Sequence, residues 1–395
     1  MESVSLPASP VYGNRIESVD ILRGMVIVLM MFVNDVAGLE KAPVLLRHVS
    51  ATTDGMTIPD VVFPAFLFVM GMSIPIALGR RIEKGRSLFG TAGHVLLRAL
   101  SLIIIGVMMV NRASDEVMGW PRGLWPLLMY SSVFAVWHQV PIDSIAGKTI
   151  SRTIRVAGVI GLIILATVFR GQDGQRLEHL WWGILGLIGW AYLIAVFIYA
   201  IIRDNRTGLV GALSLLLCLY IADREGLFVS FPVNGGTFGS LPSVALAGVV
   251  TGTLVRSHAL DHLGRIRWAL TFAGFMFAAG WLLRPLYGVN KLASTPSWCL
   301  WCSALTCASW AVLYRIVDMR GGNRILRPLG AVGANTLFAY LFAALIYTAF
   351  TVAGIGYYSL GDGPLALGLA RSVVFTVSLA AFSGWIGQRG LRLKL

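Results

Sequence analysis

"RIESVDILRGMVIVLMMFVND", residues 15–35, carries charged side chains near both ends and is otherwise almost entirely apolar. A helix needs about 20 apolar residues to cross the hydrocarbon core of a bilayer, and this stretch has that length. Twelve such runs, this one included, are centred near residues 30, 69, 102, 132, 162, 191, 215, 248, 276, 308, 340 and 377. The sequence therefore predicts an all-α fold, a polytopic transmembrane helix bundle of about 12 spans (10–12).

The composition favours a membrane protein over a soluble protein with a large core. Of the 395 residues, 56% are hydrophobic and 13% are charged, whereas a soluble domain is about 45–50% apolar and about 25% charged. The apolar excess lies in long runs, so residues 1–395 are expected to form a single integral-membrane domain with no separate soluble domain. The four cysteines lie in apolar runs and are expected to pack rather than to bind zinc, and no metal is expected.

The net charge of +13 could indicate either a nucleic-acid partner or a membrane topology. If the N-terminus is placed inside the cell, 22 of the 32 lysines and arginines fall in inner segments and ten in outer segments. An excess of Lys and Arg on the cytoplasmic side is the usual bias of polytopic membrane proteins. We therefore expect both termini to be cytoplasmic, with the lipid bilayer as a partner and no nucleic acid.

Polar side chains are unusually frequent in the first span. Asp20 and Arg23 are three residues apart, so they lie on one helical face and can pair. This pair either fixes the helix end or leaves Arg23 to hold an anionic ligand, because a guanidinium group matches phosphate well. Asn34, near the other end of the span, is either a hydrogen-bonding contact between helices or a site residue.

The polar interval "LLRHVSATTDGMTIPD", residues 45–60, joins the first two spans and faces outside in this orientation. His48 in this loop is either a solvated histidine or a functional one. Asp60 opens the next apolar run, where the helix dipole favours an acidic residue in the first turn. From that position the carboxylate could also orient an imidazole, and the two roles are compatible.

Several motifs point to one family. "SVDILRG", "VLMMFVND", "RHVS", "DVVFPAFLFVMG" and "VNR" (110–112) resemble heparan-alpha-glucosaminide N-acetyltransferase and its bacterial relatives, and "VNKLASTPSWCLWCSAL" (289–305) and "GAVGANTLFAYL" (330–341) do so more faintly. Those proteins are transmembrane acyltransferases that move an acetyl group from cytosolic acetyl-CoA to a glucosamine on the far side of the membrane. The resemblance therefore implies a single integral-membrane acyltransferase domain.

The resemblance also implies roles for individual residues. The family's catalytic outer-loop histidine falls on His48, and its neighbouring asparagine and acid fall on Asn34 and Asp60. The family's late asparagine and lysine fall on Asn335 and Lys291, and we expect these two residues, with Arg23 and Asp20 of the first span, to hold the cofactor. An imidazole could accept the acetyl group as a nucleophile or deprotonate an amine held beside the thioester, and Asn34 could donate to the developing oxyanion.

The same resemblance implies acetyl-CoA as co-substrate, an amino-sugar acceptor and an acetyl-CoA-dependent N-acetyltransferase activity. It places the chain in the plasma membrane, which is the inner membrane of a bacterium, with the active-site loop facing outside. Whether the chain forms a homodimer is left open.

Two departures and two rival functions remain. "RGLWPLLMYSS" (122–132) lacks the family's glutamine–arginine pair and "NGGTFGSLPS" (234–243) lacks one of its carboxylates, so the acceptor sugar is open. Twelve spans with polar residues inside them also fit a secondary transporter or sugar permease, although the two halves of the chain do not resemble each other as they do in many transporters. A scaffold role is the third alternative, and it predicts no loss of activity when His48 is changed.

Overall fold

The computed structural model describes residues 16–83, 88–111, 117–141, 144–228, 234–257, 259–321, 325–357 and 364–395. Over these residues the chain is mostly helical and its strands are very short, which confirms the predicted all-α fold. The helices are α1 (Glu17–Val36), α2 (Ile58–Glu83), α3 (Leu88–Asn111), α4 (Leu124–Trp137), α5 (Ile145–Val168), α6 (Gly183–Ile202), α7 (Arg206–Arg224), α8 (Leu241–Arg256), α9 (His262–Tyr287), α10 (Pro296–Tyr314), α11 (Arg327–Gly333), α12 (Thr336–Val352) and α13 (Leu365–Gln388).

The other regular elements of the described chain are short. They are the helical turns η2 (Val44–Leu46), η3 (Gly236–Ser240) and η4 (Arg315–Met319) and the strands β1 (His138–Gln139) and β2 (Arg392–Leu393). The two strands pair in antiparallel fashion. Arg112 of the "VNR" motif lies outside the described residues.

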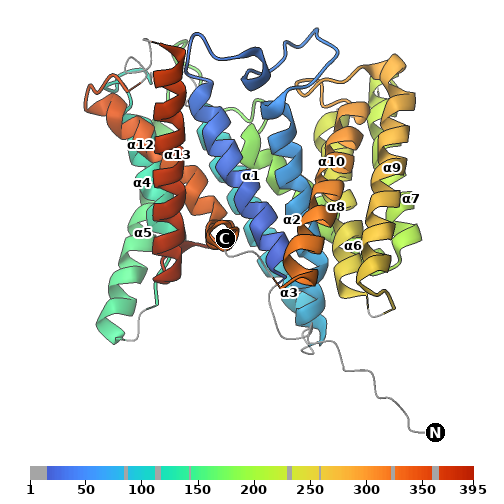
Figure 1. Ribbon diagram of the computed structural model, residues 1–395. Coiled ribbons are helices and arrows are strands. Elements are labelled where there is room, and N and C mark those ends of the chain that lie inside the picture. Colours follow the sequence, from blue (N-terminus) through green and yellow to red (C-terminus); the bar gives the residue numbers. More distant parts are fainter. Residues whose placement is uncertain are drawn as a thin grey trace, which may run out of the picture.

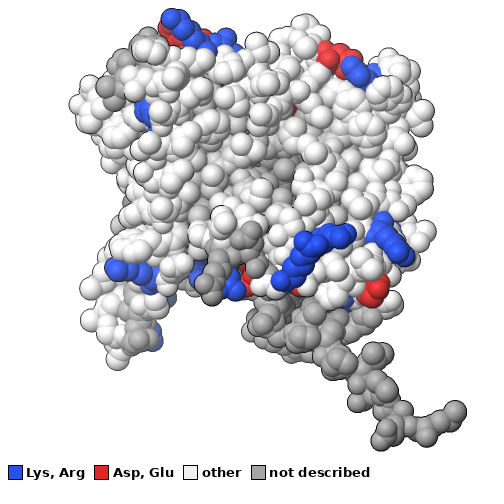
Figure 2. Space-filling view, in the orientation of Figure 1, with Lys and Arg blue, Asp and Glu red and all other residues white. Residues whose placement is uncertain are grey.

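Most of the helices have the length and composition of membrane spans. Within the described residues, nine are long and apolar enough to cross a membrane, and α11 with α12 makes a tenth if the bent pair is one span. All twelve predicted centres fall inside helices, including α1, which carries four charged residues, and α4, which has 14 residues. In Figure 2 the charged side chains of the visible face lie along the two rims, with most basic groups at the lower rim. The number of helices that cross the membrane stays a prediction.

Helix α1 stands in the middle of the bundle, between α2 on one side and α12 and α13 on the other (Figure 1). Near its beginning, Arg23 Nη1 lies 3.0 Å from Asp20 Oδ1. Near its end, the fully buried Asp35 accepts a hydrogen bond from Tyr347 of α12 and pairs with Arg371 of α13 at 3.2 Å. Because a buried charge is costly unless it is paired, these contacts hold α1 in one position against its neighbours.

Helices α2 and α8 cross at a distance that only glycine permits. A Cβ atom at Gly71 of α2 would lie 1.9 Å from the carbonyl oxygen of Ala245, and one at Gly248 of α8 would lie 1.9 Å from that of Phe68. Small residues of this kind let membrane helices bring their backbones into contact. The crossing fixes the position of α2, which carries Asp60 in its first turn.

The predicted span near residue 340 is divided into two helices. α11 ends at Gly333, α12 begins at Thr336, and the two are bent by 77°. A Cβ atom at Gly333 would lie 2.0 Å from the carbonyl oxygen of Asp20, so α11 packs directly on the backbone of α1. Asn335 lies in the break. Irregular backbone of this kind is tolerated at membrane depth only where it is buried in protein or lines a cavity.

We predict that Gly248→Ala destabilises the fold strongly. The new methyl group would overlap the Phe68 carbonyl, and relief requires α2 and α8 to separate, at a cost of about 1–3 kcal/mol or more. The matched control is Gly274→Ala in α9, where an added Cβ meets no atom within 4 Å. Thermal unfolding of the detergent-solubilised variants measures both effects. Equal melting temperatures for the two variants would contradict the close crossing.

Candidate active site

The loop between α1 and α2 is docked on the loop between α9 and α10. Asn290 Nδ2 donates to the carbonyl oxygens of Ser50 at 2.8 Å and Thr53 at 3.0 Å. Its Oδ1 accepts from the backbone N–H groups of Leu292 and Ala293 at 2.9 and 3.1 Å. Asn290 is 5% exposed, so one buried amide satisfies four backbone groups and joins the two loops.

A carboxylate adds a second attachment between the same loops. Asp54 Oδ1 accepts from the backbone N–H of Val289 at 2.7 Å, and Oδ2 accepts from Arg284 Nε at 3.0 Å. The Val289 N–H is the main reason that the pKa of Asp54 lies below its usual range, and Arg284 adds to it. The contact is therefore fully present above the usual carboxyl pKa and is lost as the pH falls through the lowered value.

The docked loop brings His48 to the first turn of α2. His48 Nδ1 lies 2.6 Å from Asp60 Oδ1, and the Asp60 side chain is buried while that of His48 is 43% exposed. A carboxylate at this distance favours the tautomer that carries the proton on Nδ1. The lone pair then lies on Nε2, the atom that accepts a proton or attacks an electrophile in other carboxylate-oriented histidines.

Asp60 also holds the beginning of α2. Its Oδ2 accepts from the Thr57 backbone N–H at 3.0 Å and from the Thr57 hydroxyl at 2.9 Å, an arrangement of residues three apart that caps the helix. The backbone carbonyl of Asp60 accepts from Trp298 Nε1 of α10 at 3.0 Å. Asp60 therefore orients His48 from a helix end that is itself held from two sides.

Lys291 completes this cluster. Its Nζ lies 3.2 Å from Nε2 and 3.3 Å from Nδ1 of His48. With the Nδ1 proton directed to Asp60, the interaction consistent with this tautomer is donation from Nζ to Nε2. Burial lowers the pKa of Lys291, and the negative charge of Asp60 opposes this effect. The cluster is therefore an imidazole between a carboxylate and an amine.

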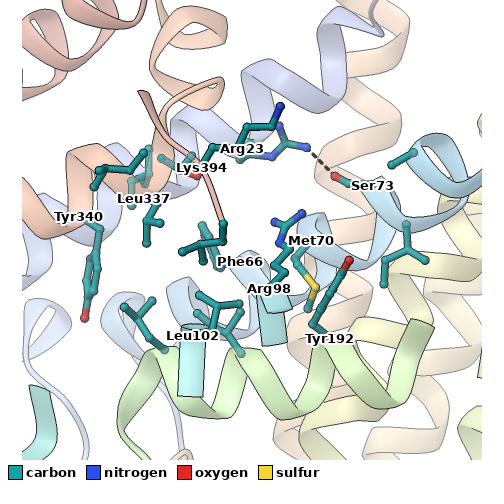
Figure 3. Close-up of a pocket in the computed structure, with 18 of the residues that line it drawn as sticks. Arg23, Phe66, Met70, Ser73, Arg98, Leu102, Tyr192, Leu337, Tyr340 and Lys394 are labelled. Carbon is teal, nitrogen blue, oxygen red and sulfur yellow. Dashed lines mark hydrogen bonds between the residues drawn. The ribbon is translucent and has the colours of Figure 1, made fainter. Parts of the chain in front are cut away.

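A cavity of about 380 Å³ lies deeper in the bundle, between α1, α2, α3, α6 and the α11–α12 break. Its walls are mostly apolar, and its polar lining includes Arg23, Ser73, His94, Arg98 and Tyr192 (Figure 3). Arg23 donates to the Ser73 hydroxyl, and the Arg98 guanidinium lies 4.9 Å from the centre of the Tyr192 ring. The lining residues of α2 run from Phe66 to Leu78, roughly 18 Å of helix. The cavity is thus long, apolar and bordered by cationic groups.

The structure separates the predicted site residues into two groups. His48, Asp60 and Lys291 form the cluster beside the docked loop, so Lys291 lies at the histidine and not with the other expected cofactor-binding residues. Arg23 and Asn335 line the deep cavity, and Asp20 is paired with Arg23 and lines a neighbouring pocket.

Asn34 belongs to neither group in the described contacts. Its side chain is exposed, and within the described residues no hydrogen bond joins it to His48 or Asp60. Its neighbour Asp35 is instead buried against α12 and α13.

Sequence reasoning missed several contributors. Arg98 lies inside the apolar run "HVLLRALSL", and a lone arginine at that depth was a usable signal for a cavity. Asn290, next to Lys291, gave no local signal, because its four partners become visible only when the two loops meet.

The part of the chain that resembles known proteins is the part that contains His48. Residues 15–114 match the family model described as "Heparan-alpha-glucosaminide N-acetyltransferase, catalytic". The chain is 38% identical over 97 residues to heparan-alpha-glucosaminide N-acetyltransferase of Homo sapiens and 39% identical over 99 residues to that of Mus musculus. Each alignment covers 25% of this chain and 14% of the relative. The segment that matches the family model contains α1, the docked loop, α2 and α3.

We predict that Asn290→Ala releases the docked loop. Each backbone group left without its partner costs about 1–3 kcal/mol when buried, so amide hydrogen exchange over residues 45–57 should accelerate at least about tenfold. Asn290→Asp keeps the acceptor half of the contact and should have a smaller effect. Asn205→Ala, which removes the cap of α7, serves as the matched control. Unchanged exchange in residues 45–57 of Asn290→Ala would show that the loop is held by other contacts.

Proposed function

We propose that this protein is a membrane-embedded acyltransferase that moves an acetyl group from acetyl-CoA to the amine of a glucosamine-like sugar. The observation that carries the proposal is the 2.6 Å contact between His48 Nδ1 and Asp60 Oδ1. It lies inside the 15–114 segment that resembles the catalytic part of the N-acetyltransferase family. A buried carboxylate that fixes the tautomer of a partly exposed imidazole is the arrangement that acyl transfer requires of a base or nucleophile.

The transfer step uses His48 Nε2 in either of two routes. As a general base, Nε2 takes a proton from the neutral sugar amine while the amine nitrogen attacks the thioester carbonyl and the C–S bond breaks. As a nucleophile, Nε2 itself attacks the thioester, releases the CoA thiolate and passes the acetyl group to the amine in a second step. In both routes the amide is formed, and the thiolate gains a proton to become the CoA thiol.

Asp60 and Lys291 support both routes. Asp60 stabilises the positive charge that develops on the imidazole, as an oriented carboxylate does in a catalytic triad. Lys291, at 3.2 Å from Nε2, is close enough to contact an oxyanion formed beside that atom. Asn34 is a second oxyanion donor in this proposal. Its side chain is exposed, so a bound substrate can contact it.

The deep cavity is the proposed site of the acyl donor. Arg23, His94 and Arg98 border it with basic groups that suit the phosphates of CoA, while its apolar walls suit the uncharged arm. On α2 the cavity lining begins at Phe66, six residues or roughly 9 Å beyond Asp60. A donor with its phosphates near Arg98 would therefore extend its thioester toward the His48 cluster.

The proposed orientation puts α1's beginning in the cytoplasm and the docked loop on the outer side of the plasma membrane. It rests on the excess of Lys and Arg on the side where α1 begins. In that orientation the donor enters from the cytoplasm, and the amino sugar meets His48 outside.

We predict that His48→Ala lowers the transfer rate by about 10²–10⁴-fold, the usual contribution of a general base. Expression and acetyl-CoA binding should be retained, because the side chain belongs to a surface loop. The matched control is His179→Ala, another exposed histidine outside the cluster. Mass spectrometry of glucosamine-type acceptors incubated with acetyl-CoA measures the product. Wild-type rates for His48→Ala would remove the basis of this site.

We predict that acetyl-CoA stabilises the detergent-solubilised protein against heat, because a ligand that binds only the folded state shifts unfolding by mass action. The shift should shrink with added salt and in Arg98→Ala, and it should persist in Arg152→Ala, which removes an arginine of α5 that does not line the cavity.

Sealed vesicles test the sidedness. Transfer should require acetyl-CoA on the side where α1 begins and the sugar on the other side. A protein that moves labelled sugar without any acyl donor, and is not stabilised by acetyl-CoA, is a transporter.

A further inference from the structure

The segment that follows α13 turns back into the bundle. Gly390 adopts φ +92°, a conformation that favours glycine, and it reverses the chain directly after the helix. Beyond it, Arg392 pairs with Gln139 and Leu393 pairs with His138 in the two-residue ladder between β2 and β1. Figure 1 accordingly shows this end of the chain at mid-height among the helices and not at the rim.

Hydrogen bonds to the main chain of this segment hold it on both sides. The Lys394 N–H donates to the carbonyl oxygen of Trp137 at 3.1 Å, at the end of α4. The carbonyl oxygen of Leu391 accepts from Asn335 Nδ2 at 3.3 Å, in the α11–α12 break. Leu393 is buried at 8% exposure. The position of the segment is therefore set by its main-chain hydrogen bonds and by the buried side chain of Leu393. None of the described hydrogen bonds involves the side chain of Lys394.

Residues 393–395 form part of the cavity lining. Lys394 joins Arg23, His94 and Arg98, which come from α1 and α3, around the same cavity (Figure 3). The described side chains that line the cavity include no aspartate or glutamate. Arg23 is paired with Asp20, and the other three basic groups are exposed around the cavity. A cluster of basic side chains around one cavity suits an anionic ligand.

We infer that the segment 390–395 is a wall of the acyl-donor site and that Lys394 binds a phosphate group of the donor. The inference rests on the proposed function. Lys394 is exposed, and its ammonium is a compact charge with three donors on a flexible stem, which suits a phosphate whose position is set by the rest of the site. The pairing of β2 with β1 then positions Lys394 at the cavity.

Binding of CoA to the detergent-solubilised full chain tests the inference. CoA lacks the acetyl group, so binding is measured without turnover. Lys394→Ala should weaken CoA binding roughly tenfold, the scale of one charge-assisted hydrogen bond, and Lys394→Glu should weaken it further. The matched control is Arg389→Ala, which removes an equal charge five residues earlier; Arg389 packs over Trp385 and does not line the cavity. S-acetylpantetheine, which has no phosphate, should bind Lys394→Ala and the unchanged protein equally.

The outcomes separate this inference from the function on which it rests. If the unchanged protein fails to bind CoA, the proposed function fails. If the unchanged protein binds CoA and Lys394→Ala binds it equally well, only the role of Lys394 is overturned. Tighter CoA binding by Lys394→Ala would overturn the inference in favour of a segment that blocks the cavity. If Arg389→Ala weakens CoA binding as much as Lys394→Ala does, the effect comes from the overall charge of the protein, and the role of Lys394 is overturned.

Discussion

Docking of the α1–α2 loop on the α9–α10 loop is the interaction on which the candidate site depends. His48 and Lys291 are 243 residues apart in the chain, and neither belongs to a helix. The buried amide of Asn290 joins their loops by satisfying backbone groups of both. Because an unpaired buried carbonyl is costly, this contact selects one arrangement of a polar interval that has few apolar residues to bury.

The other half of the site is fixed by different means. Asp60 is part of α2, and its position follows from the helix cap at Thr57 and from the crossing of Gly71 and Gly248 with the neighbouring backbones. Asp60 is therefore positioned by its helix, and His48 by the docking of its loop. If the proposed function holds, an acceptor could approach His48 from the loop side while the helices around the deep cavity keep their places.

Features that depend on the length of a run or on local spacing could be predicted from the sequence. Apolar runs of about 20 residues indicated the helices, because the thickness of the hydrocarbon core fixes that length. Spacing by three residues indicated the Asp20–Arg23 pair, because such positions share a helical face. The contact of Lys291 with His48 and the 77° break before Asn335 could not be read in this way, since both result from packing between distant segments.

Asn34 and Asp35 illustrate the same limit. Adjacent helical side chains point about 100° apart, and an apolar helix such as α1 offers no pattern to indicate which of the two faces inward.

The separation of the two groups of residues has a simple electrostatic reason. The phosphates of a CoA thioester carry charges that are very costly to place in hydrocarbon, whereas the acetyl group and the arm that bears it are uncharged. An acyltransferase that works across a membrane therefore needs its cations at one end of an apolar passage and its base at the other. In this protein α2 spans that distance alone, with Asp60 in its first turn and the cavity lining from Phe66 to Leu78. In the proposed function, the distance from Asp60 to the donor cavity is set by the rise of this one helix, so the carboxylate that orients His48 lies at a fixed distance from the donor.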